Sequence, residues 1–247
     1  MNTLFSKSVI YSISIILTTL QTPSALAMPK HVNLPEALVK DDSNWDQKLN
    51  EDNIQVFVKE VPDSSVKAFK ATTTLKAPID NVLAVMTAPN SCVEWLHGCI
   101  ISYGLDAESF NERHVYSVND LPWPATDRDY VLLISTWREP AKNQIWMEMH
   151  AVNDKKPPQE EYERVTSANT VYIFEPTNQN TTHVTWFQHT EPGGVLPDWL
   201  IDALLLDIPF KSLKKLATVA NRSKYRNAEI VTDDRGQIIG VKTAGKM

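Results

Sequence analysis

The sequence predicts an α+β domain in which one curved antiparallel sheet packs around a long C-terminal helix. Segments with strand-like alternation dominate the middle of the chain, and the turns between them are short. The longest helical pattern outside the N-terminus follows the last of those strands. A single long helix in that position can bury its apolar stripe against the concave face of the sheet.

The first 27 residues have the features of a secretory signal peptide. Lys7 precedes an apolar run from Val9 to Leu20, and Ala25-Leu26-Ala27 matches a cleavage site. The run is about a dozen residues, too short at about 1.5 Å per residue to cross a bilayer of roughly 30 Å. We therefore expect a mature chain that begins near Met28 and a periplasmic or secreted location. An uncleaved anchor helix is the alternative.

The rest of the chain has the length of one domain, which we expect over residues 28–221, followed by a polar tail over 222–247. The formal net charge is −6, and no basic run is present. An acidic chain of this kind is a poor candidate for binding nucleic acid, because phosphate contacts require clustered lysine and arginine.

After the signal peptide, the pattern from Asp42 to Glu51 predicts the end of a short helix that carries Trp45. A hairpin, two short helices and six strands are expected next. The hairpin strands are Ile54–Val61 and Ala68–Leu75, the helices are Ala77–Met86 and the segment around Trp95, and the later strands are Cys99–Ala107, Arg113–Asn119, Arg128–Arg138, Gln144–Val152, Tyr162–Glu175 and Thr182–Thr190.

Cys92 and Cys99 are seven residues apart. In an unbroken helix they would lie about 10 Å apart along the axis, but Gly98 can end the helix and let Cys99 fold back. Export favours oxidation, so we predict a disulfide, with two buried free thiols as the alternative. A zinc site is disfavoured, because only His97 lies nearby and no second cysteine pair exists.

The long helical pattern runs from Pro197 to Asn221, with apolar residues at three- and four-residue spacing. Its first half is apolar almost all the way round. Pro209 removes one backbone hydrogen bond and predicts a kink. We expect the half-helix before Pro209 to act as a lid that faces the loop 154–159 and at times a membrane. The tail beyond it should contain a small exposed hairpin.

Catalytic signatures are missing from the sequence. It contains no Gly-x-Ser-x-Gly, no Gly-x-Gly-x-x-Gly, no phosphate loop and no His-Glu-x-x-His. His183 and His189 could share one face of a strand, but two ordinary strand histidines are a better interpretation than a metal site. The sequence therefore predicts no cofactor and no metal.

The segment Leu121-Pro-Trp-Pro-Ala-Thr-Asp-Arg-Asp129 is the most specific local signal, because two prolines around Trp123 favour a rigid extended loop. It resembles the signature of START domains, the steroidogenic-acute-regulatory-related lipid-transfer family. Further similarity covers Trp45 to Asn221, including the hairpin, the Ala77-Pro78-Ile79-Asp80 helix start, Glu94-Trp95 and the Pro192-Gly193-Gly194 turn before the helix with Pro209.

This resemblance implies a helix-grip fold, similar to START and Bet v 1 proteins, with an internal tunnel for one lipid and no catalysis. Arg128 and Asp129 match the family motif, and we interpret them as structural residues that hold the Trp123 loop to the strand. Some sterol-transferring members carry an arginine six residues after the motif arginine. That position is Ile134 here, which argues against sterol specificity.

Strand alternation then suggests which side chains line the tunnel. If Arg128 points inward, so do the alternate residues after it, and later strands add apolar and polar candidates. The candidates are Tyr130, Leu132, Ile134, Trp146, Glu148, His150, Trp186, Gln188, His189, Trp199, Ala203, Leu206 and Phe210. The polar candidates could instead point outward on a half-solvated sheet.

Three functions remain open at this point. The leading hypothesis is a monomeric, exported carrier that binds a lipid or another hydrophobic small molecule and makes transient membrane contact. The second is a helix-grip cyclase or hydrolase that uses the same cavity. The third is an interaction module whose partner surface depends on the ligand.

Overall fold

The computed structural model describes residues 39 and 43–243. The predicted signal peptide and its cleavage site lie outside the described residues. Within the described part of the chain, ten strands form one sheet in the order β1-β2-β3-β10-β9-β7-β6-β5-β4, and β8 pairs in parallel with β6. The strands are β1 Asp46–Glu51, β2 Ile54–Lys59, β3 Ala68–Leu75, β4 Cys99–Ala107, β5 Glu112–Asn119, β6 Arg128–Glu139, β7 Gln144–Ala151, β8 Glu163–Arg164, β9 Ser167–Asn178 and β10 Thr181–Glu191.

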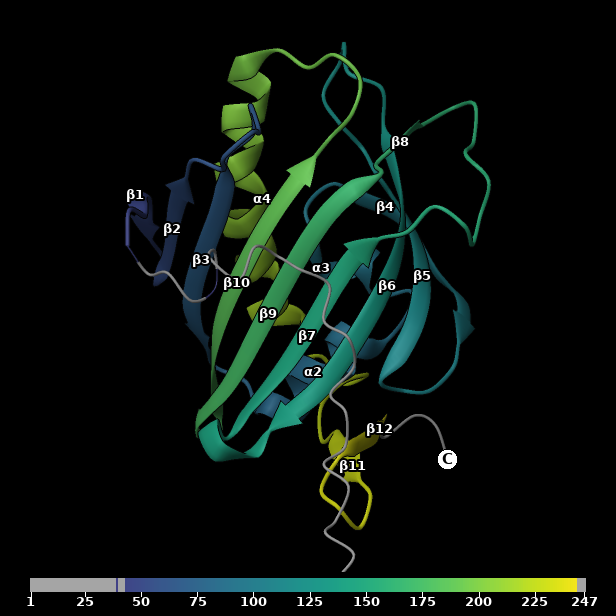
Figure 1. Cartoon of the computed structure of the whole chain (residues 1–247). Coiled ribbons are helices and arrows are strands. Elements are labelled where there is room, and N and C mark those ends of the chain that lie inside the picture. Colours follow the sequence, from purple (N-terminus) through teal and green to yellow (C-terminus); the bar gives the residue numbers. More distant parts are fainter. Residues whose placement is uncertain (1–38, 40–42, 244–247) are drawn as a thin grey trace, which may run out of the picture. The chain divides into compact units, whose positions relative to one another are not determined.

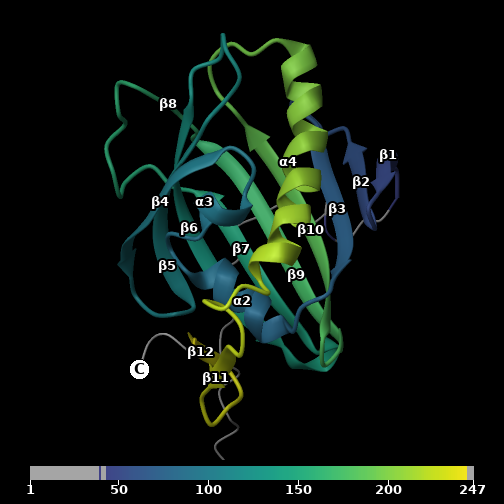
Figure 2. The same ribbon diagram turned by 180° about the vertical axis from the view of Figure 1, so that it is seen from behind.

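The helices lie against one face of this sheet, as the two opposite views show (Figures 1 and 2). They are α2 Ile79–Thr87, α3 Cys92–Trp95 and the 22-residue α4 Asp198–Val219, with a 3-10 turn at Pro140–Lys142. Leu213, Leu216 and Val219 of α4 are buried in the main core. The predicted antiparallel sheet with a long C-terminal helix on one face is confirmed, and Pro209 lies inside that helix.

An aromatic cluster forms the centre of the core on the concave face. The Trp186 ring lies 5.0 Å from Phe69 and 4.9 Å from Tyr172, measured between ring centroids. Trp95 of α3 packs edge-on against both Tyr172 and Trp186. Such aromatic contacts contribute about 0.5–1.5 kcal/mol per pair beyond the stabilisation that comes from burying the rings. The cluster therefore anchors α3 to the sheet.

The N-terminal element differs from the prediction. Asp46–Glu51 is the strand β1, not the end of a helix, and it pairs with β2. The chain reverses through Asp52 and Asn53, whose φ angles are 51° and 62°. Two consecutive residues with positive φ are the signature of a tight hairpin turn, which aligns Glu51 with Ile54.

A second difference is the predicted strand Tyr162–Glu175, which the structure divides into β8 and β9. The short strand β8 turns away to pair with the start of β6, where Glu163 lies opposite Arg128.

The small hairpin expected in the C-terminal tail is present, but within residues 222–243 it packs on the domain instead of lying fully exposed. Beyond α4 the chain forms the hairpin β11 Glu229–Thr232 and β12 Ile238–Lys242, and Ile238 is fully buried. The Asp80 Oδ1 atom accepts a hydrogen bond from the Ile230 N–H at 2.8 Å. Ile230 and Val241 also pack against the main core that contains Ile238, so burial of these side chains together with the hydrogen bond holds the hairpin on the domain.

A disulfide joins Cys92 to Cys99 with a Cα–Cα distance of 5.9 Å. The chain turns back at Gly98, whose φ is 85°. The bond closes the segment between α3 and β4. Among the described residues, no helix is long and apolar enough to span a membrane.

Candidate functional site

A cavity of about 390 Å³ lies between the first half of α4 and one end of the concave face. Its apolar wall comes mainly from α4 and the loop before it. The remaining wall comes from β3, β6, β10, the turn before β4 and the loop between β5 and β6. The lining side chains include Phe69, His97, Asn119, Arg128, Tyr130, Gln188, Leu196, Trp199, Leu200, Ala203 and Leu204.

The turn between β10 and α4 sets the position of the apolar wall. Gly193 and Gly194 have φ angles of 67° and 59°, which L side chains rarely adopt. A Cβ atom on Gly193 would also lie 3.1 Å from the Glu163 Oε1 atom. Pro197 then precedes the first helical turn. This sequence of turn residues brings α4 back over the end of the sheet.

Arg128 holds that turn in place. Its Nε atom donates to the Pro192 carbonyl at 3.2 Å, and one terminal nitrogen donates to the Gly193 carbonyl at 2.9 Å. The other terminal nitrogen donates to the Thr126 carbonyl. Desolvation lowers the pKa of Arg128, and the nearby Glu163 partly offsets this effect. The side chain is only 2% exposed and also lines the cavity.

Asp129 has a different role from the one we predicted. It does not hold the Trp123 loop but forms a two-pronged ion pair with Arg164, at 3.0 Å and 2.7 Å. The loop is instead closed by Asp127, whose Oδ1 atom accepts a hydrogen bond from the Leu121 N–H at 3.1 Å. Trp123 itself is 90% exposed, followed by a cis peptide bond to Pro124.

Three polar side chains face the cavity beside Arg128. The Oδ1 atom of Asn119 is buried without a hydrogen-bond partner. Burial raises the pKa of Tyr130 to about 12. Gln188 is engaged by Thr170 and Thr190. The cavity therefore has one polar end and one apolar wall.

His97 lies at the contact between α3 and α4. Its backbone N–H donates to the Oγ atom of the buried Ser212 at 2.9 Å. Desolvation, followed by the charges of Lys211 and Lys215, lowers the pKa of the His97 imidazole. The neutral imidazole is therefore favoured beside the two lysines.

The tunnel-lining candidates separate into three groups. Tyr130, Gln188, Trp199 and Ala203 line the cavity. Ile134 and Trp186 are buried in the main core, and Leu132, Leu206 and Phe210 pack against that core without reaching the cavity. Trp146, Glu148, His150 and His189 lie on the opposite, convex face.

The convex assignment follows from the strand registers. In β7, Ile145, Met147 and Met149 belong to or pack against the main core, so the alternate residues point away. Trp146 packs with Val171 and Phe187 in a separate cluster under Trp45. We assigned the inward direction of β6 correctly and that of β7 incorrectly. The prediction also missed His97 and Asn119, which carry no local sequence signal.

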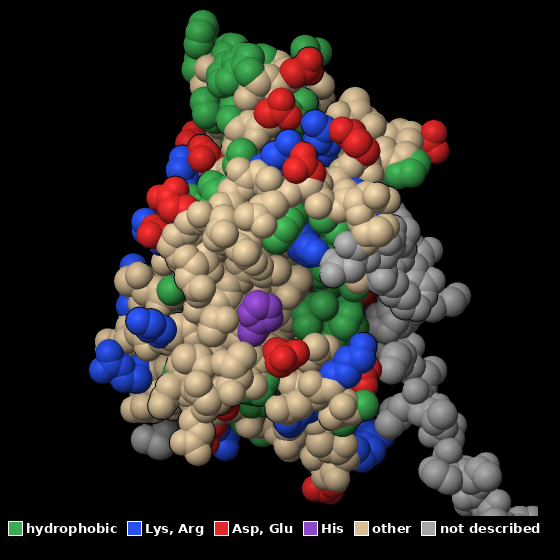
Figure 3. Space-filling view, turned by 90° about the vertical axis from the view of Figure 1, so that its left-hand side faces the viewer, with side chains coloured by type: hydrophobic (Ala, Val, Ile, Leu, Met, Phe, Trp, Pro, Cys, Tyr) green, Lys and Arg blue, Asp and Glu red, His purple; other side chains and the backbone are tan. Residues whose placement is uncertain are grey.

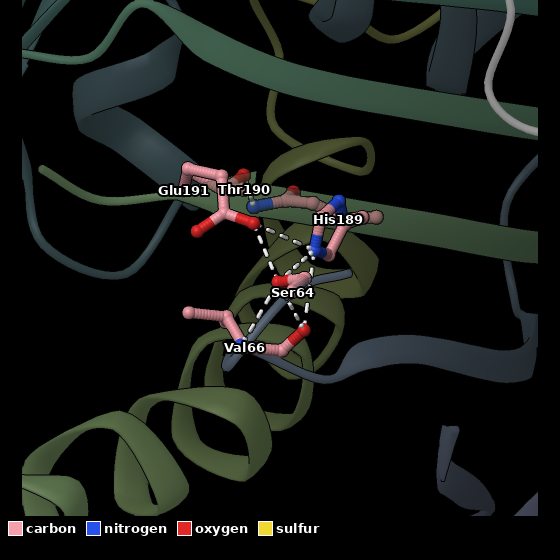
Figure 4. A network of polar contacts seen from close by, with 6 residues as sticks. Ser64, Val66, His189, Thr190 and Glu191 are labelled. Atoms are coloured by element: carbon pink, nitrogen blue, oxygen red, sulfur yellow. Dashed lines mark hydrogen bonds and ion pairs between the residues drawn. The ribbon is translucent and has the colours of Figure 1, made fainter. Parts of the chain in front are cut away.

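A polar network on the convex face resembles a catalytic triad in composition only (Figure 4). The Ser64 Oγ atom donates to the Glu191 Oε1 atom at 2.5 Å and lies 3.1 Å from the His189 Nε2 atom. The same Nε2 atom lies 3.4 Å from Glu191 Oε1. In a Ser-His-acid triad the carboxylate holds the other ring nitrogen. Here Ser64 and Glu191 lie next to the same ring nitrogen of His189, so the arrangement is not that of a triad. Its structural effect is to join the turn between β2 and β3 to the end of β10.

The histidines of β10 also have separate partners. The His183 Nδ1 atom lies 3.2 Å from the Thr74 Oγ1 atom, whereas His189 lies next to Ser64 and the Val66 carbonyl. No cluster of three potential metal ligands occurs among residues 43–243.

The half-helix before Pro209 does not face the loop 154–159, contrary to our expectation. Lys155 of that loop pairs with Asp106 at 3.2 Å, and Arg164 donates to the Lys156 carbonyl at 2.9 Å. These bonds hold the loop near β4 and β6. The segments opposite α4 across the cavity are His97–Gly98 and Asn119–Pro122.

Comparison with known proteins gives consistent results. The model of the START domain family matches residues 32–225. An uncharacterized protein of Pseudomonas aeruginosa is 30% identical over 179 residues, which cover 72% of this chain and 88% of that protein. START domain-containing protein 10 of human and mouse is 26% identical over 95 residues, 38% of this chain and 32% of that protein.

Solved structures show the same fold. A STAR-related lipid transfer protein fragment from Xanthomonas axonopodis superposes with a TM-score of 0.66 and 27% identity, covering 72% of this chain and 99% of that chain. Human STARD10 superposes with a TM-score of 0.65 and 20% identity, covering 74% and 76%.

Proposed function

Because the chain belongs to the START domain family, we propose that it binds one lipid or another hydrophobic small molecule in the cavity under α4 and transfers it between membranes. The observation that carries this proposal is the cavity of about 390 Å³, whose wall is the apolar first half of α4. The volume lies within the range of about 300–1,000 Å³ usual for small-molecule sites.

The apolar wall provides the binding energy. Each methylene group moved from water to an apolar surface contributes about 0.8 kcal/mol, so ten buried methylenes contribute about 8 kcal/mol before the cost of association. Trp199, Leu200, Ala203 and Leu204 supply that surface. The ligand needs no covalent bond to the protein.

A carrier is favoured over a cyclase or hydrolase. Among the cavity-lining residues that the structure describes, no hydroxyl or thiol group is hydrogen-bonded to a histidine or a carboxylate, whereas such a pair is expected of a serine- or cysteine-type nucleophile. The Ser64, His189 and Glu191 network lies outside the cavity and lacks the order of a triad.

Exposed apolar side chains next to the cavity support membrane contact. Trp123, Val195 and Trp199 are 90%, 96% and 62% exposed. Trp123 adjoins the cavity-lining Leu121 and Pro122, and Val195 precedes the cavity-lining Leu196. Hydrophobic side chains gather over the start of α4, at the top of Figure 3. We infer that this apolar rim (Trp123, Val195 and Trp199) enters a bilayer surface during lipid exchange, because aromatic side chains favour the membrane interface.

Export remains part of the proposal. The segment from Lys7 to Ala27 supports a cleavable signal peptide and a periplasmic or secreted location. N-terminal sequencing of the protein recovered outside the cytoplasm should show a first residue near Met28. An intact N-terminus embedded in the membrane would contradict it.

The function is tested by transfer of a fluorescent lipid between donor and acceptor vesicles. We expect Trp123→Ala to bind vesicles about tenfold more weakly and to transfer lipid more slowly, because one large apolar contact is lost. Its unfolding free energy should change by less than about 0.5 kcal/mol, since the side chain is exposed. The matched control is Ile239→Ala, an exposed apolar residue of β12 at the opposite end of the sheet from the start of α4 (Figure 1). If the unaltered protein neither binds lipid nor transfers it, the proposed carrier function is wrong.

A further inference from the structure

The cavity wall contains a buried cation that makes no direct ion pair among the described residues. Three cationic and two anionic side chains line it: Lys67, Arg128, Lys211, Asp120 and Asp207. Lys211 pairs with Asp207 at 2.7 Å, and Lys67 pairs with Glu60 outside the cavity at 3.4 Å. Among the described residues, no ion pair within 4.0 Å joins Arg128 to a carboxylate. Asp120 is the other wall charge without a direct ion pair, but it is exposed, and Glu163 offsets part of the Arg128 charge from outside the cavity. Arg128 is therefore the buried cation of the cavity wall that no carboxylate pairs with directly.

Arg128 also has hydrogen-bonding capacity to spare. A guanidinium group carries five N–H donors, and three are used by the carbonyls of Thr126, Pro192 and Gly193. Because the side chain is only 2% exposed, bulk water has little access to the two remaining N–H donors. A buried cation is costly unless an anion or further acceptors complete its shell.

Two neighbours extend this polar end. Asn119 lies directly opposite Arg128 in the register between β5 and β6, and its buried Oδ1 atom has no donor. Tyr130 lies two residues after Arg128, on the same face of β6. Burial keeps the pKa of Tyr130 at about 12, so its hydroxyl remains a hydrogen-bond donor at neutral pH. The three groups together offer donors for an anion and one acceptor for a hydroxyl group.

The cavity volume limits the hydrocarbon. Sites for small molecules have cavity volumes of about 300–1,000 Å³. This cavity, at about 390 Å³, lies near the lower end of that range. Its size fits one acyl chain of medium length better than two chains with a glycerol head group.

Resting on the proposed function, we propose that the cavity selects a single-chain amphiphile with an anionic head group, a carboxylate or a phosphate monoester, bound by Arg128. The Tyr130 hydroxyl donates a second hydrogen bond to the anion. Asn119 accepts a hydrogen bond from a hydroxyl group of the ligand or from an acid proton. The chain lies along Leu200, Ala203 and Leu204 of α4.

The test is calorimetric titration of delipidated protein with ligands that share one chain length. The probes are dodecanoate, dodecyl phosphate, dodecanol and dilauroyl phosphatidylcholine, together with acetate and inorganic phosphate as free anions. We expect both anionic amphiphiles to bind at least about tenfold more tightly than dodecanol, and the free anions to bind without measurable heat. Equal affinity for dodecanoate and dodecanol would overturn the inference, as would tighter binding of the two-chain lipid.

Variants test whether the proposed residues cause the preference for an anionic head group. Arg128→Gln should reduce the ratio of dodecanoate to dodecanol affinity to about one, while dodecanol binding reports an intact cavity. Because Arg128 also holds the turn before α4, Tyr130→Phe serves as a second variant, and it should lower the same ratio by several fold. Arg138→Gln, on the same strand but outside the cavity, is the control with an unchanged ratio.

The failures of the two proposals are distinguishable. If no amphiphile binds, the lipid-carrier function itself is wrong. If dodecanol and phosphatidylcholine bind as well as dodecanoate, the carrier stands and the anionic single-chain selectivity is wrong. An unchanged ratio in both Arg128→Gln and Tyr130→Phe would place the head group elsewhere.

Discussion

The buried pair between Asp129 and Arg164 makes a quantitative prediction. Asp129 is fully buried and the Arg164 side chain is nearly so, and two hydrogen bonds of 3.0 Å and 2.7 Å join them. Asp129→Ala removes both acceptors and leaves a guanidinium group buried without its counterion. Removal of one partner of such a pair costs about 3–5 kcal/mol. At about 2–4 °C per kcal/mol for a domain of this size, the melting temperature should fall by roughly 6–20 °C.

The assay is thermal and urea unfolding followed by circular dichroism, with a double-mutant cycle. The double variant Asp129→Leu with Arg164→Met removes both charges, so it should recover much of the stability that the single variants Asp129→Leu and Arg164→Met each lose. Asp129→Ala should still bind lipid at temperatures below its transition, because Asp129 points away from the cavity that Arg128 lines. A loss below about 1 kcal/mol for Asp129→Ala would refute our account of this pair.

Three further predictions concern the core, the contact between α3 and α4, and the disulfide. Ile134→Arg should destabilise the domain by several kcal/mol or prevent folding, because it buries a second cation in the core beside Arg113. An unchanged melting temperature and unchanged lipid binding would contradict the location of Ile134 in the core. Stability should decline as the pH falls through about 6.5, since protonation of His97 is unfavourable in the folded state, and His97→Gln should make this decline shallower in melting curves between pH 8 and 5. Cys99→Ser opens a closed loop of about eight residues, so urea unfolding should show a loss of about 2–3 kcal/mol, and reduction of the unaltered protein should give a similar loss.

The sequence alone determined the class of fold and the order of its elements. Alternation of apolar residues placed the main strands, and the three- and four-residue spacing after Pro197 placed α4. These features depend on local periodicity, so they can be read without knowledge of the fold. The segment around Trp123 also pointed to the family that the chain belongs to.

Tertiary structure alone decided which face of each strand meets the cavity. Both faces of the central strands carry apolar residues, because Trp146 and Phe187 pack under Trp45 on the convex side. A period of two therefore fits either orientation, and the pattern of β7 could not show that Met147 points inward. The cavity also occupies one end of the sheet, so Ile134 faces the core and never reaches it.

The same reason applies to the residues that complete the site and the domain. Asn119 and Arg128 are nine residues apart in the sequence and meet because β5 pairs with β6. The hairpin after α4 lies in a polar tail, yet its apolar side chains pack on the main core and the Ile230 N–H reaches Asp80 of α2. Local sequence patterns determine the secondary structure, whereas contacts between distant segments determine which polar groups are buried and which hydrogen bonds they form.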